Sequence, residues 1–272
     1  MNEQTRHTKT LFALDVVTLA GDPDASKDFY AAAFGPLMSK SAGSVEVDMH
    51  GTGRFELASA TTDDGSGGEG ASSSFPGYVV TYALAQPSEV QAVMDTAAHA
   101  GAQVLKPAKK ALFGSFSGSF RAPDGSIWKV AADSNKNKGP VAAAPRPTEI
   151  SIILGVKDPK ASRAFYQALG LKTDRDYGNK YIDFHPVDGA VRLCLMQRGV
   201  LAKDVGINDP GDGTGGLTLS HRAATNEDIE QLIAVADSSG SRSATPQAHE
   251  AELGSGHFAD PDGFRWNLST SK

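Results

Sequence analysis

The feature that most constrains the fold of this chain is an internal repeat. Segment 22–30, DPDASKDFY, returns as segment 158–166, DPKASRAFY. Segment 118–125, GSFRAPDG, returns as segment 256–263, GHFADPDG, and a tryptophan follows each copy at the same spacing. Two landmarks in the same order predict two halves built on the same plan.

Composition and length agree with a two-domain protein. The chain has 272 residues, enough for two domains of ordinary size. We expect domain 1 at residues 11–133 and domain 2 at residues 148–271. Residues 134–147 are polar at first and then rich in alanine and proline, which is typical of an exposed linker.

Each half divides into two units of the order βαβββ. In the first half, β-branched and apolar runs predict strands at 14–19, 45–49, 54–58, 78–84, 116–121 and 126–131. Apolar residues at helical spacing predict helices at 24–34 and 88–100, the second with a capping box of Ser88 and Gln91. The second half repeats this pattern, with strands at 149–156, 181–184, 191–196 and 217–221 and helices at 160–169 and 226–238.

Charge and cysteine content exclude several classes of protein. The net charge is -6 and no basic stretch is interleaved with aromatic residues, so we expect no nucleic-acid partner. No apolar run approaches the ~20 residues that span a bilayer, and the first ten residues show no secretion signal, so we expect no membrane partner. The single cysteine, Cys194, forms no internal disulfide, which favours a cytoplasmic location.

The two motifs, with the strand before the first and the Leu/Phe-Gly after it, resemble the vicinal oxygen chelate superfamily. This group includes glyoxalase I, extradiol dioxygenases and bleomycin-resistance proteins. The resemblance spans nearly the whole chain and implies an α+β fold. In the implied fold, four βαβββ units form two glyoxalase-like domains, each expected to be a half-open, curved, eight-stranded sheet with helices on its convex side. Because duplication supplies both halves of each cavity, a monomer suffices, and we expect a monomer or a homodimer.

The resemblance also implies where a metal site stands in relatives: on the first and last strands of two units per cavity. In the first half these positions are held by Asp15, Glu56, Val79 and Lys129. In the second half they are held by Ser151, Cys194, Thr218 and Asn267. A divalent metal needs converging nitrogen or oxygen donors, and a protonated lysine offers none. We therefore expect no metal and no other cofactor, and we expect Lys129 to pair with Asp15 or Glu56 on the concave face of the first domain.

Other residues have structural interpretations that compete with functional ones. Tyr30 and Tyr166 are expected in the core, and Asp22 and Asp158 at helix N-termini. His221 lies an odd number of residues from Thr218, so we expect it on the opposite face as a hydrogen-bonded structural residue. Segment 112–118 places Phe113 and Phe116 among small residues, at the mouth of the first cavity or at the entry of a strand.

The leading hypothesis is a metal-independent small-molecule-binding protein of the glyoxalase/bleomycin-resistance type. It would bind an apolar or aromatic compound, to sequester it or to transform it without a metal. The candidate ligand-binding residues are Asp15, Glu56, Lys129, Phe113, Phe116, Ser151, Cys194, Thr218 and Asn267. One alternative is a glyoxalase- or dioxygenase-like lyase, isomerase or oxidoreductase whose metal is held by Asp15, Glu56 and further residues. The other is a structural or interaction protein whose cavities are filled.

Overall fold

The computed structural model describes residues 12–41, 43–59, 74–110, 115–208, 210–247 and 254–270. These residues form the four βαβββ units that the repeat predicts. Unit 1 comprises β1 (Val16–Ala20), α1 (Pro23–Phe34), β2 (Leu37–Ser41), β3 (Ser44–Asp48) and β4 (Arg54–Ala58). Unit 2 comprises β5 (Tyr78–Leu84), α2 (Pro87–His99), β6 (Gln103–Lys110), β7 (Phe116–Arg121) and β8 (Ile127–Ala132).

The second half adds one helix to this plan. Unit 3 comprises β9 (Glu149–Val156), α3 (Pro159–Ala168), β10 (Thr173–Asp176), β11 (Ile182–Phe184) and β12 (Arg192–Gln197). The extra helix, α4 (Arg198–Val205), follows directly. Unit 4 comprises β13 (Leu217–Ala223), α5 (Asn226–Ser238), β14 (Ser243–Gln247), β15 (Ser255–Ala259) and β16 (Arg265–Thr270).

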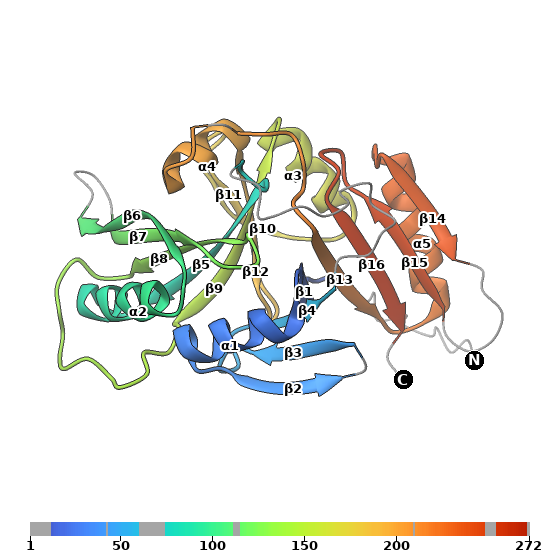
Figure 1. Ribbon diagram of the computed structural model, residues 1–272. Helices are drawn as coiled ribbons and strands as arrows, with labels where there is room; N and C mark the ends of the chain where they lie inside the picture. The colour runs from blue at the N-terminus through green and yellow to red at the C-terminus, as the bar shows by residue number, and fades with distance from the viewer. Residues whose placement is uncertain are drawn as a thin grey trace, which may run out of the picture.

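The strands form two mixed, eight-stranded sheets, which confirms the predicted fold class (Figure 1). Sheet A has the order β14-β15-β16-β13-β1-β4-β3-β2, and sheet B has the order β10-β11-β12-β9-β5-β8-β7-β6. Each sheet therefore joins one unit of the first half to one unit of the second, through the antiparallel pairs β1–β13 and β5–β9. The expectation that each cavity belongs to one half is wrong.

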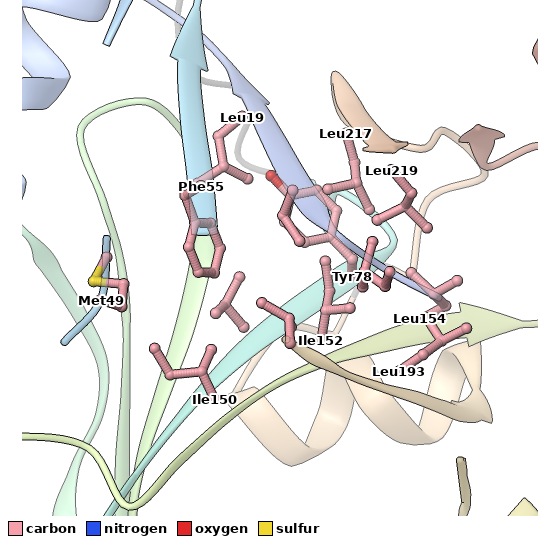
Figure 2. Packing of buried hydrophobic residues seen from close by; sticks show 14 of the residues in the cluster. Leu19, Met49, Phe55, Tyr78, Ile150, Ile152, Leu154, Leu193, Leu217 and Leu219 are labelled. Carbon is pink, nitrogen blue, oxygen red and sulfur yellow. The ribbon is translucent and has the colours of Figure 1, made fainter. Parts of the chain in front are cut away.

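Within each half, the two units pack together through the aromatic residues of the repeat. Phe34 of α1 lies 4.7 Å from Trp128 of β8, measured between ring centroids, and Phe165 of α3 lies 5.9 Å from Phe258 of β15. Most buried side chains of the two sheets belong to one cluster, in which Leu19 and other residues of sheet A lie near residues of sheet B such as Ile152 (Figure 2).

Tyr30 and Tyr166 are buried in the core, as predicted, and each ties the first helix of its half to the terminal hairpin. The Tyr30 hydroxyl donates to Asp124 at 2.7 Å, and the Tyr166 hydroxyl donates to Asp260 at the same distance. The two aspartates occupy different positions of the repeat, because the first half has an alanine, Ala122, where the second half has Asp260. The two tyrosines thus make equivalent hydrogen bonds to aspartates that stand at different positions of the turn.

The helix ends confirm most of the local predictions. Asp22 and Asp158 accept hydrogen bonds from the first backbone N–H groups of α1 and α3. The predicted capping box of α2 is wrong: the helix begins at Pro87, after Gln86, which makes no side-chain cap. Pro87 instead stands at the first helical position, where its ring fixes φ near the helical value.

The sequence did not predict the outer strands or α4. β2 and β6 form edges of the two sheets, and most of their side chains are exposed. Edge strands bury no complete face, so they lack the alternation of apolar and polar residues that identifies inner strands. α4 has only eight residues and directly follows a strand.

Candidate functional site

The eight positions matched to the metal site of relatives divide between the two sheets, in a different grouping from the one expected. Sheet A carries Glu56 on β4, Thr218 on β13 and Asn267 on β16, and Asp15 directly precedes its strand β1. Sheet B carries Val79, Lys129, Ser151 and Cys194. The first-half set is therefore never brought together.

The concave face of sheet B is covered by α4. Leu201, Ala202 and Val205 of this helix are fully buried. They belong to a cluster separate from the main core, together with residues of the sheet that include Val79 and Cys194. Figure 1 shows α4 above the strands of unit 3. The helix therefore closes this face of the sheet.

Lys129 lies on the face of sheet B that α4 covers, and its partner is not the expected one. Its ammonium donates to Oδ2 of Asp204, on α4, at 2.6 Å. Glu56 belongs to sheet A, and Asp15 pairs elsewhere, so the predicted ion pair of Lys129 with either carboxylate is wrong. The lysine fastens α4 to the sheet.

Cys194 and Ser151 are buried under the same cover. The Cys194 thiol accepts a hydrogen bond from the Tyr181 hydroxyl at 3.1 Å, and burial raises the pKa of this thiol to about 12. A thiol with such a pKa carries almost no thiolate at neutral pH and is a poor nucleophile. Cys194 is therefore a packing residue, which corrects its assignment as a ligand contact.

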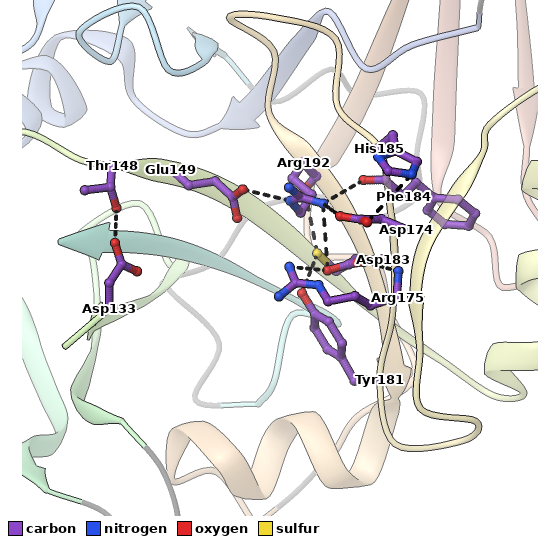
Figure 3. Close-up of polar contacts among 11 residues, drawn as sticks. Asp133, Thr148, Glu149, Asp174, Arg175, Tyr181, Asp183, Phe184, His185 and Arg192 are labelled. Carbon is purple, nitrogen blue, oxygen red and sulfur yellow. Dashed lines mark hydrogen bonds and ion pairs between the residues drawn. The ribbon is translucent and has the colours of Figure 1, made fainter. Parts of the chain in front are cut away.

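One end of the same sheet carries a network of ion pairs (Figure 3). Arg192 donates to Glu149 at 2.9 Å and to Asp174 at 2.7 Å. Arg175 lies 2.5 Å from Asp183, whose side chain is completely buried. The hydrogen bond from Arg192 is the main cause that lowers the pKa of Asp174. This network joins β9, β10, β11 and β12, and both of its guanidiniums face carboxylates, so neither is a free cation for a ligand.

The concave face of sheet A, in contrast, contains an open groove of about 570 Å³. Its polar walls come from β3, β4, β13 and β16, with Glu46, Arg54, Glu56, Ser220 and Arg222 among the lining residues. Two further hollows, of about 410 and 510 Å³, lie beside it along β13 and β16. Their lining includes Thr218, His257, Arg265 and Asn267.

Glu56 faces this groove, as predicted, and Asp15 does not. Glu56 accepts a hydrogen bond from the Thr18 hydroxyl at 3.3 Å. Asp15 accepts from the backbone N–H of Arg222 at 2.7 Å and lies 2.9 Å from Nδ1 of His221. Its side chain borders a separate hollow of about 280 Å³ at the end of the sheet. Asp15 therefore pins the start of β1 to β13.

His221 has the structural role that its odd offset predicts. Its side chain is 2 % exposed and stacks edge-on against Phe12, with ring centroids 5.0 Å apart. Of the two phenylalanines expected at a cavity mouth or at a strand entry, one lies in the described part of the chain. Phe113 lies outside the described residues, and Phe116 packs against the main core on the helix side of sheet B, which corrects its assignment as a ligand contact.

A family model named Glyoxalase/Bleomycin resistance protein/Dioxygenase superfamily matches residues 14–130 and 150–268. The chain belongs to this superfamily. A solved structure titled as a putative dioxygenase from Bacillus subtilis aligns with a TM-score of 0.61 at 15% identity, covering 96% of this chain and 86% of that one. Glyoxalase I from Zea mays aligns with a TM-score of 0.58 at 17% identity, covering 95% and 92%. No curated protein matches.

These likenesses show the fold of the superfamily. In this chain, the residues at the positions matched to the metal site of relatives do not form a set of ligands that fits a metal ion. On sheet A the positions offer Glu56, the hydroxyl of Thr218 and the carboxamide of Asn267, while Asp15 is bound to His221. On sheet B they offer an aliphatic residue, a paired lysine, a hydroxyl and a buried thiol. Throughout the described residues, no three His, Cys, Asp or Glu side chains converge.

Four charged residues that line the groove or the hollows beside it were not predicted from the sequence: Glu46, Arg54, Arg222 and Arg265. The signal was present for two of them. Arg222 lies four residues after Thr218, and Arg54 lies two residues before Glu56. Because side chains alternate along a strand, Arg222 shares the sheet face of Thr218 and Arg54 shares that of Glu56.

No helix among the described residues is both long and apolar enough to cross a membrane.

Proposed function

We propose that this protein binds a small molecule in the groove of sheet A, and that binding needs no metal ion. The observation that carries the proposal is the contrast between the two concave faces. One is covered by α4, whereas the other contains a groove of about 570 Å³ with charged walls. Ligand sites in proteins are concave, with a few polar groups that orient the ligand.

The groove favours a compound that carries polar groups beside an apolar part. Its apolar lining includes Val16 of β1 and Leu37 of β2. Arg54, Arg222 and Glu56 provide hydrogen-bonding groups around this lining. An aromatic or aliphatic body on the apolar residues, with a charged or hydrogen-bonding substituent, matches this distribution. Such binding serves sequestration of the compound or its transformation without a metal.

The test is to titrate isotope-labelled protein with a panel of aromatic carboxylates and aromatic amines in the presence of EDTA. We expect NMR shift changes at strands β1, β3, β4 and β13 of sheet A. Ser220→Phe, which fills the groove, should abolish them, and Ser238→Phe on the exposed end of α5 should leave them unchanged. Shift changes that need added metal, or that map to sheet B, would contradict the proposal.

A further inference from the structure

The groove is lined by three carboxylates, of Glu46, Asp48 and Glu56, and by two guanidiniums, of Arg54 and Arg222. Glu46 of β3 lies directly opposite Glu56 of β4 in the strand register. Like charges in that position repel each other. Among the described residues, each has a hydroxyl donor, from Ser39 at 3.4 Å and Thr18 at 3.3 Å, and no cation within ion-pair distance. This row therefore carries negative charge that the protein itself does not compensate.

The positive charges lie in the next two rows along the strands. Arg54 lies two residues before Glu56 on β4, directly opposite Asp48 of β3, and Arg222 on β13 lies one row beyond Arg54. Within the described part of the chain, neither guanidinium has a hydrogen bond or an ion pair. Elsewhere in the chain, Arg175 and Arg192 both face carboxylates. The two groove arginines are exposed and thus remain available to a ligand.

Arg54 and Arg222 can reach the same ligand group. β4 and β13 lie on either side of β1, and neighbouring strands are about 4.8 Å apart. Both residues line the groove together with Val16 of β1, the strand between them, and with Ser220, which lies two residues before Arg222 on β13. Two guanidiniums over one small apolar floor suit an anionic group that accepts hydrogen bonds from both.

We propose that the ligand of this groove is a zwitterionic small molecule. Its anionic group lies between Arg54 and Arg222, and its ammonium group lies at Glu46 and Glu56. This inference rests on the proposed function and names the class of ligand. Residues two apart on a strand are separated by about 6.7 Å along it, which is the spacing of Arg54 from Glu56, and Arg222 lies one further step away. A dipeptide spans at most about 7 Å from its amino to its carboxyl end, which matches the spacing of Glu56 and Arg54.

The probe that tests the inference is glycyl-phenylalanine, whose ring can lie on the apolar lining. Two capped forms each remove one charge: N-acetyl-glycyl-phenylalanine lacks the ammonium, and glycyl-phenylalaninamide lacks the carboxylate. In isothermal titration calorimetry at low salt, we expect the free dipeptide to bind at least about tenfold more tightly than either capped form, because each charge is met by an opposite one.

Two variants locate the two ends of the probe. Arg222→Gln should remove the preference for the free dipeptide over its amide, and Glu46→Gln should remove the preference over its acetylated form. Arg146→Gln in the linker and Glu230→Gln on α5, both exposed, are the matched controls and should keep both preferences. Unfolding midpoints of all four variants check that the fold is retained.

Equal affinity for the three probes, or no binding of the dipeptide at millimolar concentration, would overturn the zwitterion. The zwitterion would also be overturned if Arg222→Gln or Glu46→Gln lowered the affinity for all three probes by the same factor. The proposed function fails separately, when the compounds of the NMR panel give no shift changes at sheet A. Binding of singly charged compounds at sheet A without binding of the dipeptide leaves the proposed function standing and rejects this inference.

Discussion

Lys129 and Asp204 form an ion pair at the junction of α4 and sheet B, with side chains 23% and 35% exposed. Solvent reaches both groups, so the pair contributes little. We expect Lys129→Met to lower the free energy of unfolding by about 1 kcal/mol and to leave ligand binding at sheet A unchanged. Urea denaturation of Lys129→Met, Asp204→Asn and the double variant measures the coupling.

Lys109→Met is the control for this cycle, because Lys109 is exposed on the edge strand β6. A coupling energy near zero would contradict a fastening role for the pair. Loss of ligand binding at sheet A in Lys129→Met would instead show that a change in sheet B affects the groove, which the separation of the two sites does not predict.

Asp260 is a second residue whose surroundings give a measurable effect. Burial raises its pKa to about 6, although the Tyr166 hydroxyl and two backbone N–H groups donate to it. Between about pH 4 and pH 6 the folded state therefore binds more protons here than the unfolded state. The stability that this carboxyl contributes is present at low pH and falls as the pH rises through 6.

We expect Asp260→Asn to remove this dependence, because an amide does not titrate. The destabilisation caused by the substitution should be larger at pH 4 than at pH 7, by up to about 3 kcal/mol. Urea denaturation at the two pH values measures it, with Asp188→Asn on an exposed turn as the control. A penalty that is larger at pH 7 would reverse the sign and reject the assignment.

At the scale of elements, α4 decides which concave face is open. Leu201 is fully buried against sheet B, and Leu-to-Ala changes in such positions leave a cavity. We expect Leu201→Ala to cost about 2–4 kcal/mol and to expose Cys194, which belongs to the same cluster. The thiol should then react with an aromatic disulfide reagent in native buffer, whereas the unmodified protein should react only after unfolding.

Val200→Ala is the matched control on the same helix, because Val200 is 46% exposed. It should leave both the stability and the thiol reactivity near those of the unmodified protein. Equal reactivity of Cys194 in Leu201→Ala and in the unmodified protein would show that α4 does not shield the sheet.

The whole molecule depends on strand pairing between its halves. β1 and β5 of the first half pair with β13 and β9 of the second, so neither half completes a sheet. We expect fragments 1–139 and 140–272 to form a one-to-one complex when expressed together. Each fragment alone should self-associate, because its unpaired strands are open edges. Light scattering after size-exclusion chromatography measures the masses, and a folded, monomeric fragment 1–139 would contradict this expectation.

The sequence by itself determined the local and repeated features of this protein. Alternation, helical spacing and capping residues predicted the inner strands, four helices and the N-termini of α1 and α3. The repeat predicted two halves, and the tyrosines of its first motif proved to be core residues. The odd offset of His221 predicted its face. These signals are readable because each depends on neighbours in the chain.

Tertiary structure decided which units share a sheet, and therefore which residues meet. Glu56 and Lys129 lie in one half of the sequence and in different sheets, because strand pairing across the halves is a long-range choice that no local period encodes. The eight residues of α4 gave no periodic signal, yet their packing covers sheet B. The open groove of sheet A, with its unpaired arginines, exists only once distant strands are brought side by side, because burial and charge compensation depend on those neighbours.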